Sequence, residues 1–107
     1  MTARYRSVFR PCLLAGHVIV VTGGGSGIGR CSAHELAALG AHVVLVGRNL
    51  EKLQTVAEEI VVDGGQASFH SADIRDEAAV RALVTAIVVT HGRIHGLVNN
   101  AGGQYIS

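Results

Sequence analysis

The stretch from Val18 to Gly29 constrains this chain most, because a short apolar run leads into five glycines within seven residues and then into a helical pattern. Gly23 lies where a strand would have to turn, and glycine adopts positive φ without a Cβ clash. Gly25 and Gly27 would allow backbone N–H groups to approach a bound phosphate closely, and Gly29 would allow the helix to pack near the strand. The stretch therefore predicts a strand, a phosphate-binding turn and a helix.

The spacing of these glycines differs from two common nucleotide-binding motifs. Gly23-x-x-x-Gly27-x-Gly29 is not G-x-G-x-x-G, and no Lys-Ser/Thr pair follows it as in a P-loop. A diphosphate at the turn would meet unsatisfied N–H donors and the positive end of the helix dipole. A tight turn without a ligand is the alternative, but the strand before it and the helix after it favour nucleotide binding.

Apolar and helical patterns alternate along the rest of the chain, which is typical of a parallel sheet built from βαβ units. Right-handed crossovers and a doubly wound order predict a Rossmann-like α/β fold with four strands in the order 3-2-1-4 and three helices. The expected strands are 17–21, 42–46, 67–70 and 96–98, and the expected helices are 27–39, 50–62 and one running from an Asp76 N-cap to Gly92.

The helices also carry apolar stripes at helical spacing, which predict the faces that they bury. The first two helices should cover one face of the sheet, and the third should be almost alone on the other. The expected buried positions are Leu50, Leu53, Ala57, Ile60 and Val61 in the second helix and Val80, Leu83, Val84, Ile87 and Val88 in the third.

Two motifs resemble those of the short-chain dehydrogenase/reductase family. Thr22-Gly-Gly-Gly-Ser-Gly-Ile-Gly29 is similar to the family's cofactor turn, and Leu97-Val-Asn-Asn-Ala-Gly102 is similar to its Asn-Asn-Ala-Gly segment. The resemblance implies an incomplete dinucleotide-binding domain over residues 14–107, after a lead-in of residues 1–13. It also implies cofactor contacts at Thr22, Gly23, Gly25, Ser26, Gly27, Ile28, Gly29, Asn99, Ala101 and Gly102.

The end of the second strand bears on the choice of dinucleotide. An acidic residue about twenty residues beyond the turn would accept a hydrogen bond from the ribose 2′-OH of NAD, whereas an Arg pairs with the 2′-phosphate of NADP. Arg48 occupies this place, and no acidic residue follows until Glu51. The sequence therefore favours NADP(H) over NAD(H), the alternative being that Arg48 only caps a surface loop.

Asp73 and Ile74 follow the third strand. In the family resembled, this pair meets adenine, with the carboxylate at the edge of the base and the apolar side chain on its face. A carboxylate can accept from the exocyclic amine, and an aliphatic chain can lie on the ring. The alternative is a loop aspartate at an acid-rich helix entry, because Asp76 and Glu77 come soon after.

No catalytic residue is expected within these 107 residues. The family's chemistry uses a Ser and a Tyr-x-x-x-Lys set beyond the Asn-Asn-Ala-Gly segment, but neither Tyr5 nor Tyr105 has a Lys four residues later. Residues 103–107 resemble the peroxisomal trans-2-enoyl-CoA reductase branch, although that branch has Gly where Ala101 stands. The resemblance thus implies hydride transfer to a carbonyl or enoyl substrate, including acyl-CoA, in a fuller homo-oligomeric chain. A non-catalytic nucleotide-binding module and a nonfunctional truncated product are the alternatives.

Composition excludes several other classes of function. A formal net charge of +1 gives no reason to expect nucleic acid as a partner, and no apolar stretch is long enough to span a membrane. The Arg-rich start is not read as an export signal, because the apolar run after it is the first strand. We expect a cytoplasmic protein with reduced, partly buried thiols and no metal site, since Gly92 separates His91 from His95. The isolated chain is expected to be marginally stable and to associate.

Overall fold

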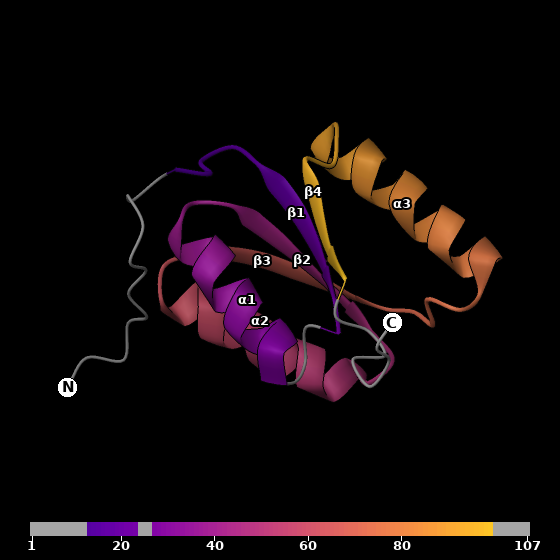
Figure 1. The fold of residues 1–107 in the computed structure, drawn as a ribbon, viewed down its shortest axis with the longest axis horizontal. Helices are drawn as coiled ribbons and strands as arrows, with labels where there is room; N and C mark the ends of the chain where they lie inside the picture. The colour runs from indigo at the N-terminus through magenta and orange to yellow at the C-terminus, as the bar shows by residue number, and fades with distance from the viewer. Residues whose placement is uncertain (1–12, 24–26, 100–107) are drawn as a thin grey trace.

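The computed structural model describes residues 13–23 and 27–99. Strands and helices alternate through both ranges, and no boundary differs from its expected position by more than one residue (Figure 1). The elements are β1 (Val18–Thr22), α1 (Gly27–Ala38), β2 (His42–Gly47), α2 (Leu50–Val62), β3 (Gln66–Ser71), α3 (Glu77–His91) and β4 (Gly96–Asn99).

The four strands form one parallel sheet in the order β3-β2-β1-β4. This order confirms the predicted Rossmann-like topology. Val20 of β1 pairs with Val44 of β2 on one side and with Leu97 of β4 on the other. Val44 pairs in turn with Ser68 of β3. The register therefore brings the carboxyl ends of all four strands to the same edge of the sheet.

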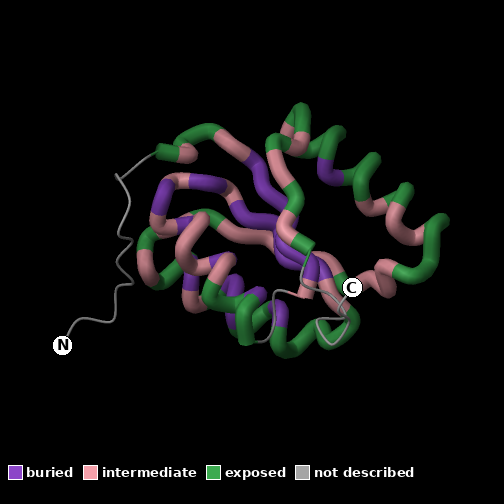
Figure 2. Tube along the Cα trace, viewed as in Figure 1, coloured by how far each residue is buried: buried purple, intermediate pink, exposed green. Residues whose placement is uncertain are grey.

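The central strands β1 and β2 form the core of the molecule, and much of their length is purple, the colour of buried residues, in Figure 2. Every residue of β1 is buried, as are the four inner residues of β2. Central parallel strands are covered on both faces, which explains their continuous runs of Val, Ile and Leu. The flanking strands β3 and β4 contain no fully buried residue.

The two faces of the sheet are covered by different helices, as predicted (Figure 1). On one face, α1 and α2 pack against alternate residues of β1 and β2, including Ile19, Val21, Val43 and Leu45. On the other face, Val18, Val20, Val44 and Val46 form a smaller cluster with Ile87 of α3. The alternation follows from the two-residue period of a strand.

The buried stripe of α2 differs from the expected one at two positions. Leu53, Ala57 and Ile60 are buried as predicted, but Leu50 and Val61 are 49% and 56% exposed. Val56, which was not on the predicted stripe, is buried as well. The helix turns about 100° per residue, so Val56 adjoins the other buried positions on one side of the stripe, while Leu50 and Val61 lie beyond its other side.

In α3 the expected stripe is buried at only one position. Ile87 is 2% exposed, whereas Val84 and Val88 are 42% and 40% exposed. Val80 and Leu83 are partly buried. The prediction was wrong for the two exposed valines, because among the described residues no second helix packs beside α3 on its face of the sheet (Figure 1).

The helix ends follow the expected local chemistry. The Asp76 carboxylate accepts hydrogen bonds from the first-turn N–H groups of Ala78 and Ala79, as an N-cap does. Gly92 ends α3 with φ at +91°, a conformation that glycine adopts without strain. Cys31 on α1 is exposed rather than partly buried as expected. Within the described ranges, the search for a helix long and apolar enough to cross a membrane finds none.

Candidate dinucleotide site

The candidate site lies at the carboxyl edge of the sheet, where β1 ends at Thr22 and its pairing partners end beside it. Thr22 pairs with Val46 of β2 and with Asn99 of β4. The amino end of α1 starts at Gly27, close after the end of β1 in the chain. A parallel α/β sheet binds its ligand at this edge, outside the carboxyl ends of the strands.

The glycine turn is described at its two ends. Gly23 has φ at +70°, the left-handed conformation expected where the strand turns, and its N–H donates to the Val46 carbonyl at 2.8 Å. Gly27 has φ at +48° and begins α1, and Gly29 is buried on that helix. The predicted contacts Gly25 and Ser26 lie outside the described residues, as do Ala101 and Gly102.

The first turn of α1 favours an anion. It carries no acidic side chain that would offset the positive end of the helix dipole. Ile28, in this turn, is 75% exposed, so an apolar side chain lies at the surface beside the helix start. The turn thus presents backbone N–H groups and a positive field.

The two family-like motifs meet directly through Thr22 and Asn99. The Thr22 hydroxyl donates to Oδ1 of Asn99 at 2.9 Å and lies 3.4 Å from the Val98 carbonyl oxygen. Thr22 itself is 7% exposed. The bond fixes the Asn99 side chain at the end of β4, next to the glycine turn. Sequence reasoning missed this contact because it depends on the register between β1 and β4.

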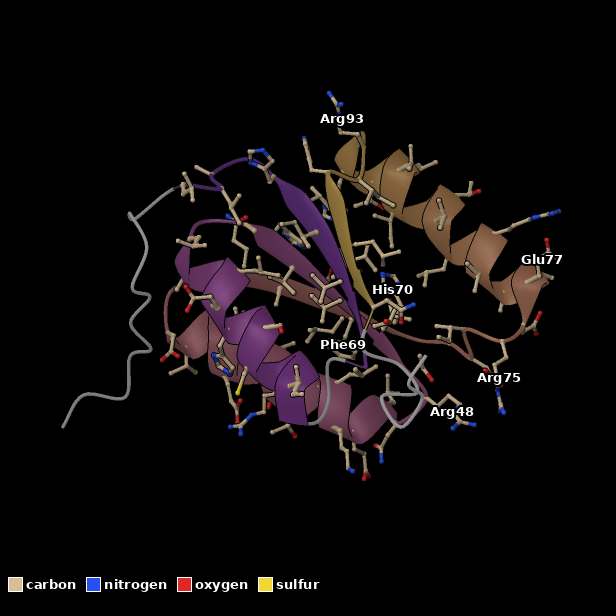
Figure 3. All side chains as sticks on the ribbon, viewed as in Figure 1. Arg48, Phe69, His70, Arg75, Glu77 and Arg93 are labelled. Carbon is tan, nitrogen blue, oxygen red and sulfur yellow. The ribbon has the colours of Figure 1, made fainter. Side chains whose placement is uncertain are left out.

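Arg48 follows β2 directly and is exposed. Its carbonyl oxygen accepts from Ser71 Oγ at 3.4 Å, and the neighbouring Gly47 carbonyl accepts from the Ala72 N–H at 2.8 Å. These bonds hold the segment after β2 against the segment after β3. The Arg48 side chain projects from this carboxyl edge, at the opposite end of the molecule from Arg93 (Figure 3).

Asp73 is held by Arg75, two residues later. One carboxylate oxygen of Asp73 accepts from the backbone N–H of Arg75 at 2.9 Å and from its Nε at 3.1 Å, while the other accepts from Nη2 at 3.2 Å. These hydrogen bonds from Arg75, with smaller contributions from the charges of Arg75 and Arg48, lower the pKa of Asp73 to about 2. The carboxylate is therefore ionised at neutral pH. Sequence reasoning did not identify Arg75, although the Asp-x-Arg spacing after a strand is visible in the sequence.

Ile74, which follows Asp73, is partly in the core and partly at the carboxyl edge of the sheet. It is partly buried and packs against the cluster of Val18, Val20 and Ile87 beneath α3. Part of its side chain therefore belongs to the core, which leaves a smaller apolar surface at the edge than sequence reasoning implied.

Four of the six histidines form two ring contacts. The rings of His42 and His91 have centroids 4.4 Å apart, and those of His17 and His95 are 4.7 Å apart. Val18 N–H donates to Nδ1 of His95 at 2.9 Å. In the part of the chain that the structure describes, no group of three or more His, Cys, Asp or Glu residues could hold a metal ion.

The arrangement of strand ends, glycine turn and helix start is matched by one protein family. Residues 17–107 match the short chain dehydrogenase family. The chain belongs to this family. Among curated short chain dehydrogenase relatives, the peroxisomal 2,4-dienoyl-CoA reductase of Danio rerio is 36% identical over 104 residues, which cover 96% of this chain and 35% of that protein.

Solved structures of short chain dehydrogenases show the same fold. The citronellol catabolism dehydrogenase of Pseudomonas aeruginosa is 65% identical with a TM-score of 0.87, and the alignment covers 89% of this chain and 40% of that one. A metagenomic short-chain oxidoreductase in complex with NADP is 45% identical with a TM-score of 0.77, covering 78% and 38%. The chain spans 34–35% of the length of the first curated relatives that it matches.

Proposed function

We propose that this chain is the NADP(H)-binding part of a short chain dehydrogenase whose whole protein transfers hydride between the nicotinamide and a carbonyl or enoyl substrate. Membership of the family supports binding of a nicotinamide dinucleotide. Similarity to an acyl-CoA reductase and to a dienoyl-CoA reductase supports an acyl thioester as one substrate class. No catalytic residue is assigned within the 107 residues, because they contain no Tyr-x-x-x-Lys sequence.

The observation that carries the choice of NADP(H) is the position of Arg48. It is the first residue after β2, it is exposed, and the first acidic residue after it is Glu51 in α2. A guanidinium pairs with a phosphate dianion through charge-assisted hydrogen bonds, whereas a ribose 2′-OH offers it no negative charge. The similar metagenomic oxidoreductase in complex with NADP supports the same choice.

The other predicted contacts are assigned to different parts of the dinucleotide along the sheet edge. In this proposal the pyrophosphate lies against Gly25, Ser26 and the start of α1, and Asn99, Ala101 and Gly102 contact the ribose and nicotinamide side. Asp73 and Ile74 hold the adenine. The carboxylate of Asp73 has about four acceptor positions, so it can accept from the adenine amine while it remains bonded to Arg75.

The test is a titration of the purified protein with NADPH and with NADH, followed by nicotinamide fluorescence. Arg48→Ala should weaken NADPH binding by roughly 10- to 100-fold, because a hydrogen bond to a charged group is worth about 1.5–3 kcal/mol and about 1.4 kcal/mol corresponds to a factor of ten. NADH binding should change little. Arg93→Ala is the matched control, since it removes the same side chain at the far end of the molecule.

The outcomes separate the alternatives. Equal losses for NADPH and NADH would overturn the assignment of Arg48. Saturable binding without turnover in the whole protein would favour a non-catalytic nucleotide-binding module. An absence of saturable binding would favour a product that does not function.

A further inference from the structure

The Asp73 carboxylate lies on the strand end next to the one where the proposed function needs the positive charge of Arg48. Asp73 follows β3, and Arg48 follows the neighbouring strand β2. The Ala72 N–H to Gly47 carbonyl bond and the Ser71 hydroxyl to Arg48 carbonyl bond hold the two segments together. The positive charge of Arg48 also contributes to lowering the pKa of Asp73, so the two charges act on each other.

This arrangement poses a problem for a ligand with a 2′-phosphate. A phosphate monoester carries close to two negative charges at neutral pH. The Asp73 carboxylate alone would repel such a group and would offset the single charge of Arg48, since like charges at a binding surface oppose association. Some feature of the edge must compensate for Asp73 if Arg48 is to favour the phosphate.

Arg75 has the geometry to do this. Its Nε and Nη2 contact the two oxygens of the Asp73 carboxylate at 3.1 and 3.2 Å, and its backbone N–H adds a third bond at 2.9 Å. Two parallel N–H···O bonds from a guanidinium are a strong and directional form of pairing. With Arg75 in place, the three side chains of Arg48, Asp73 and Arg75 have a formal net charge of +1 rather than zero.

We infer that Arg75 is a specificity-determining residue of this site, which neutralises Asp73 so that the charge of Arg48 selects the 2′-phosphate of NADP(H). This inference rests on the proposed function. Arg75 acts here through Asp73 and not by contact with the phosphate. Its side chain is 74% exposed, so solvent and salt reduce the effect.

The experiment measures the dissociation constants of NADPH and NADH for the whole protein and takes their ratio. Adenine and the pyrophosphate are common to both cofactors, so the ratio isolates the 2′-phosphate. Arg75→Gln should lower the preference for NADPH about fivefold at low ionic strength, the size typical of an exposed charge interaction. The effect should shrink at about 1 M salt, where the Debye length is about 3 Å.

A double variant separates neutralisation from direct contact. If Arg75 acts through Asp73, adding Asp73→Asn to Arg75→Gln should restore the original ratio. If the double variant stays as low as Arg75→Gln alone, Arg75 contacts the phosphate itself and the inference is overturned. Arg75→Lys keeps the charge and should keep most of the preference.

Arg93→Gln serves as the control for a change in net charge, because Arg93 lies at the opposite end of the molecule (Figure 3). Thermal unfolding of each variant checks that it is folded. A wild-type preference for NADPH that Arg75→Gln leaves unchanged refutes the inference and leaves the proposed function standing. Failure of the wild-type protein to bind either cofactor refutes both.

Discussion

The helices α1 and α2 bury one face of the sheet more completely than α3 buries the other. On the first face, Ala33, Ala37, Leu53, Val56 and Ile60 pack against the strands and are all buried. Ile87 is the one buried residue of α3, a helix described along its whole length. Figure 2 shows the same contrast, with α3 mostly exposed along its length. Tertiary packing supplies most of the stability of a helix, so α3 should depend more on local interactions than α2 does.

Exposed apolar side chains show where the less covered face is open. Val84 and Val88 of α3 and Leu97 of β4 are 42%, 40% and 64% exposed. Leu97 pairs with Val20, whose side chain belongs to the cluster beneath α3. An apolar surface of this kind beside an edge strand promotes association. We therefore expect mutations on the two faces, and a change of pH, to change the free energy of unfolding by different amounts.

The largest difference should come from shortening one core side chain on each face. Leu53→Ala should reduce the free energy of unfolding by about 4 kcal/mol and Ile87→Ala by about 2 kcal/mol, because the cost of a cavity depends on how far its surroundings can collapse. Leu53 clusters with residues of α1, of α2 and of the sheet, whereas Ile87 of α3 clusters with buried residues of the sheet alone. Urea unfolding measures both values. Equal losses would contradict the contrast between the faces.

A methyl group added at a glycine should give the next largest effect. A Cβ at Gly65 would lie 2.8 Å from Ile60 Cγ2 and 3.2 Å from Ala37 Cβ, where α1, α2 and the start of β3 meet. Gly65→Ala should therefore cost about 2 kcal/mol through overpacking. Gly96→Ala on β4 is the control, because its Cβ would meet only Ile19, at 3.8 Å. A stable Gly65→Ala variant would show that the first face is less tightly packed than these distances indicate.

Removal of a helix N-cap should have a smaller effect, and an unequal one. Asp76→Ala deletes the acceptor for two N–H groups of α3 and should cost about 1 kcal/mol. Asn49→Ala deletes the acceptor for the Lys52 N–H of α2 and should cost less, because packing also holds that helix. Amide hydrogen exchange should show the Asp76→Ala effect in α3 itself. A loss of protection spread evenly over all three helices would argue against an independently weak α3.

The smallest predicted effect is a loss of stability in mild acid that acts on the α3 face. His42 lies in β2 on the side of Val44 and Val46, and its ring contacts that of His91 at the end of α3. Burial, and after it the charge of His91, lowers the pKa of His42 from its ordinary 6.5, although a hydrogen bond with Gln66 opposes the shift.

The unfolded chain therefore binds more protons than the folded chain just below pH 6.5, and stability should fall as the pH drops through this range. Loss of hydration, with the charges of His17 and Arg93, shifts the pKa of His95 downward in the same direction. Unfolding measured between pH 7.5 and 5 should show the decline, and His42→Gln should reduce it. Stability that rises on acidification would contradict the lowered pKa values of His42 and His95.

Much of the fold could be predicted because its signals are local. The N-cap at Asp76, the stop at Gly92 and the glycine-rich turn each depend on a few adjacent residues, and the strand order followed from general rules of handedness. The exposure of Leu50, Val61, Val84 and Val88 could not be predicted in the same way. An apolar stripe tells which side of a helix can be buried, but a neighbouring element must be present to bury it.

In the candidate site, too, some features depend on a few adjacent residues and others depend on contacts between distant parts of the chain. The sequence by itself determined the family, the glycine turn and the placement of Arg48 after a strand, since these depend on residue type and spacing. Only the tertiary structure brought the Thr22 hydroxyl against Asn99, 77 positions away, and joined the Ser71 hydroxyl to the Arg48 carbonyl. Contacts of this kind require the register of parallel strands, and strand register arises from packing across the whole sheet rather than from any short stretch of chain.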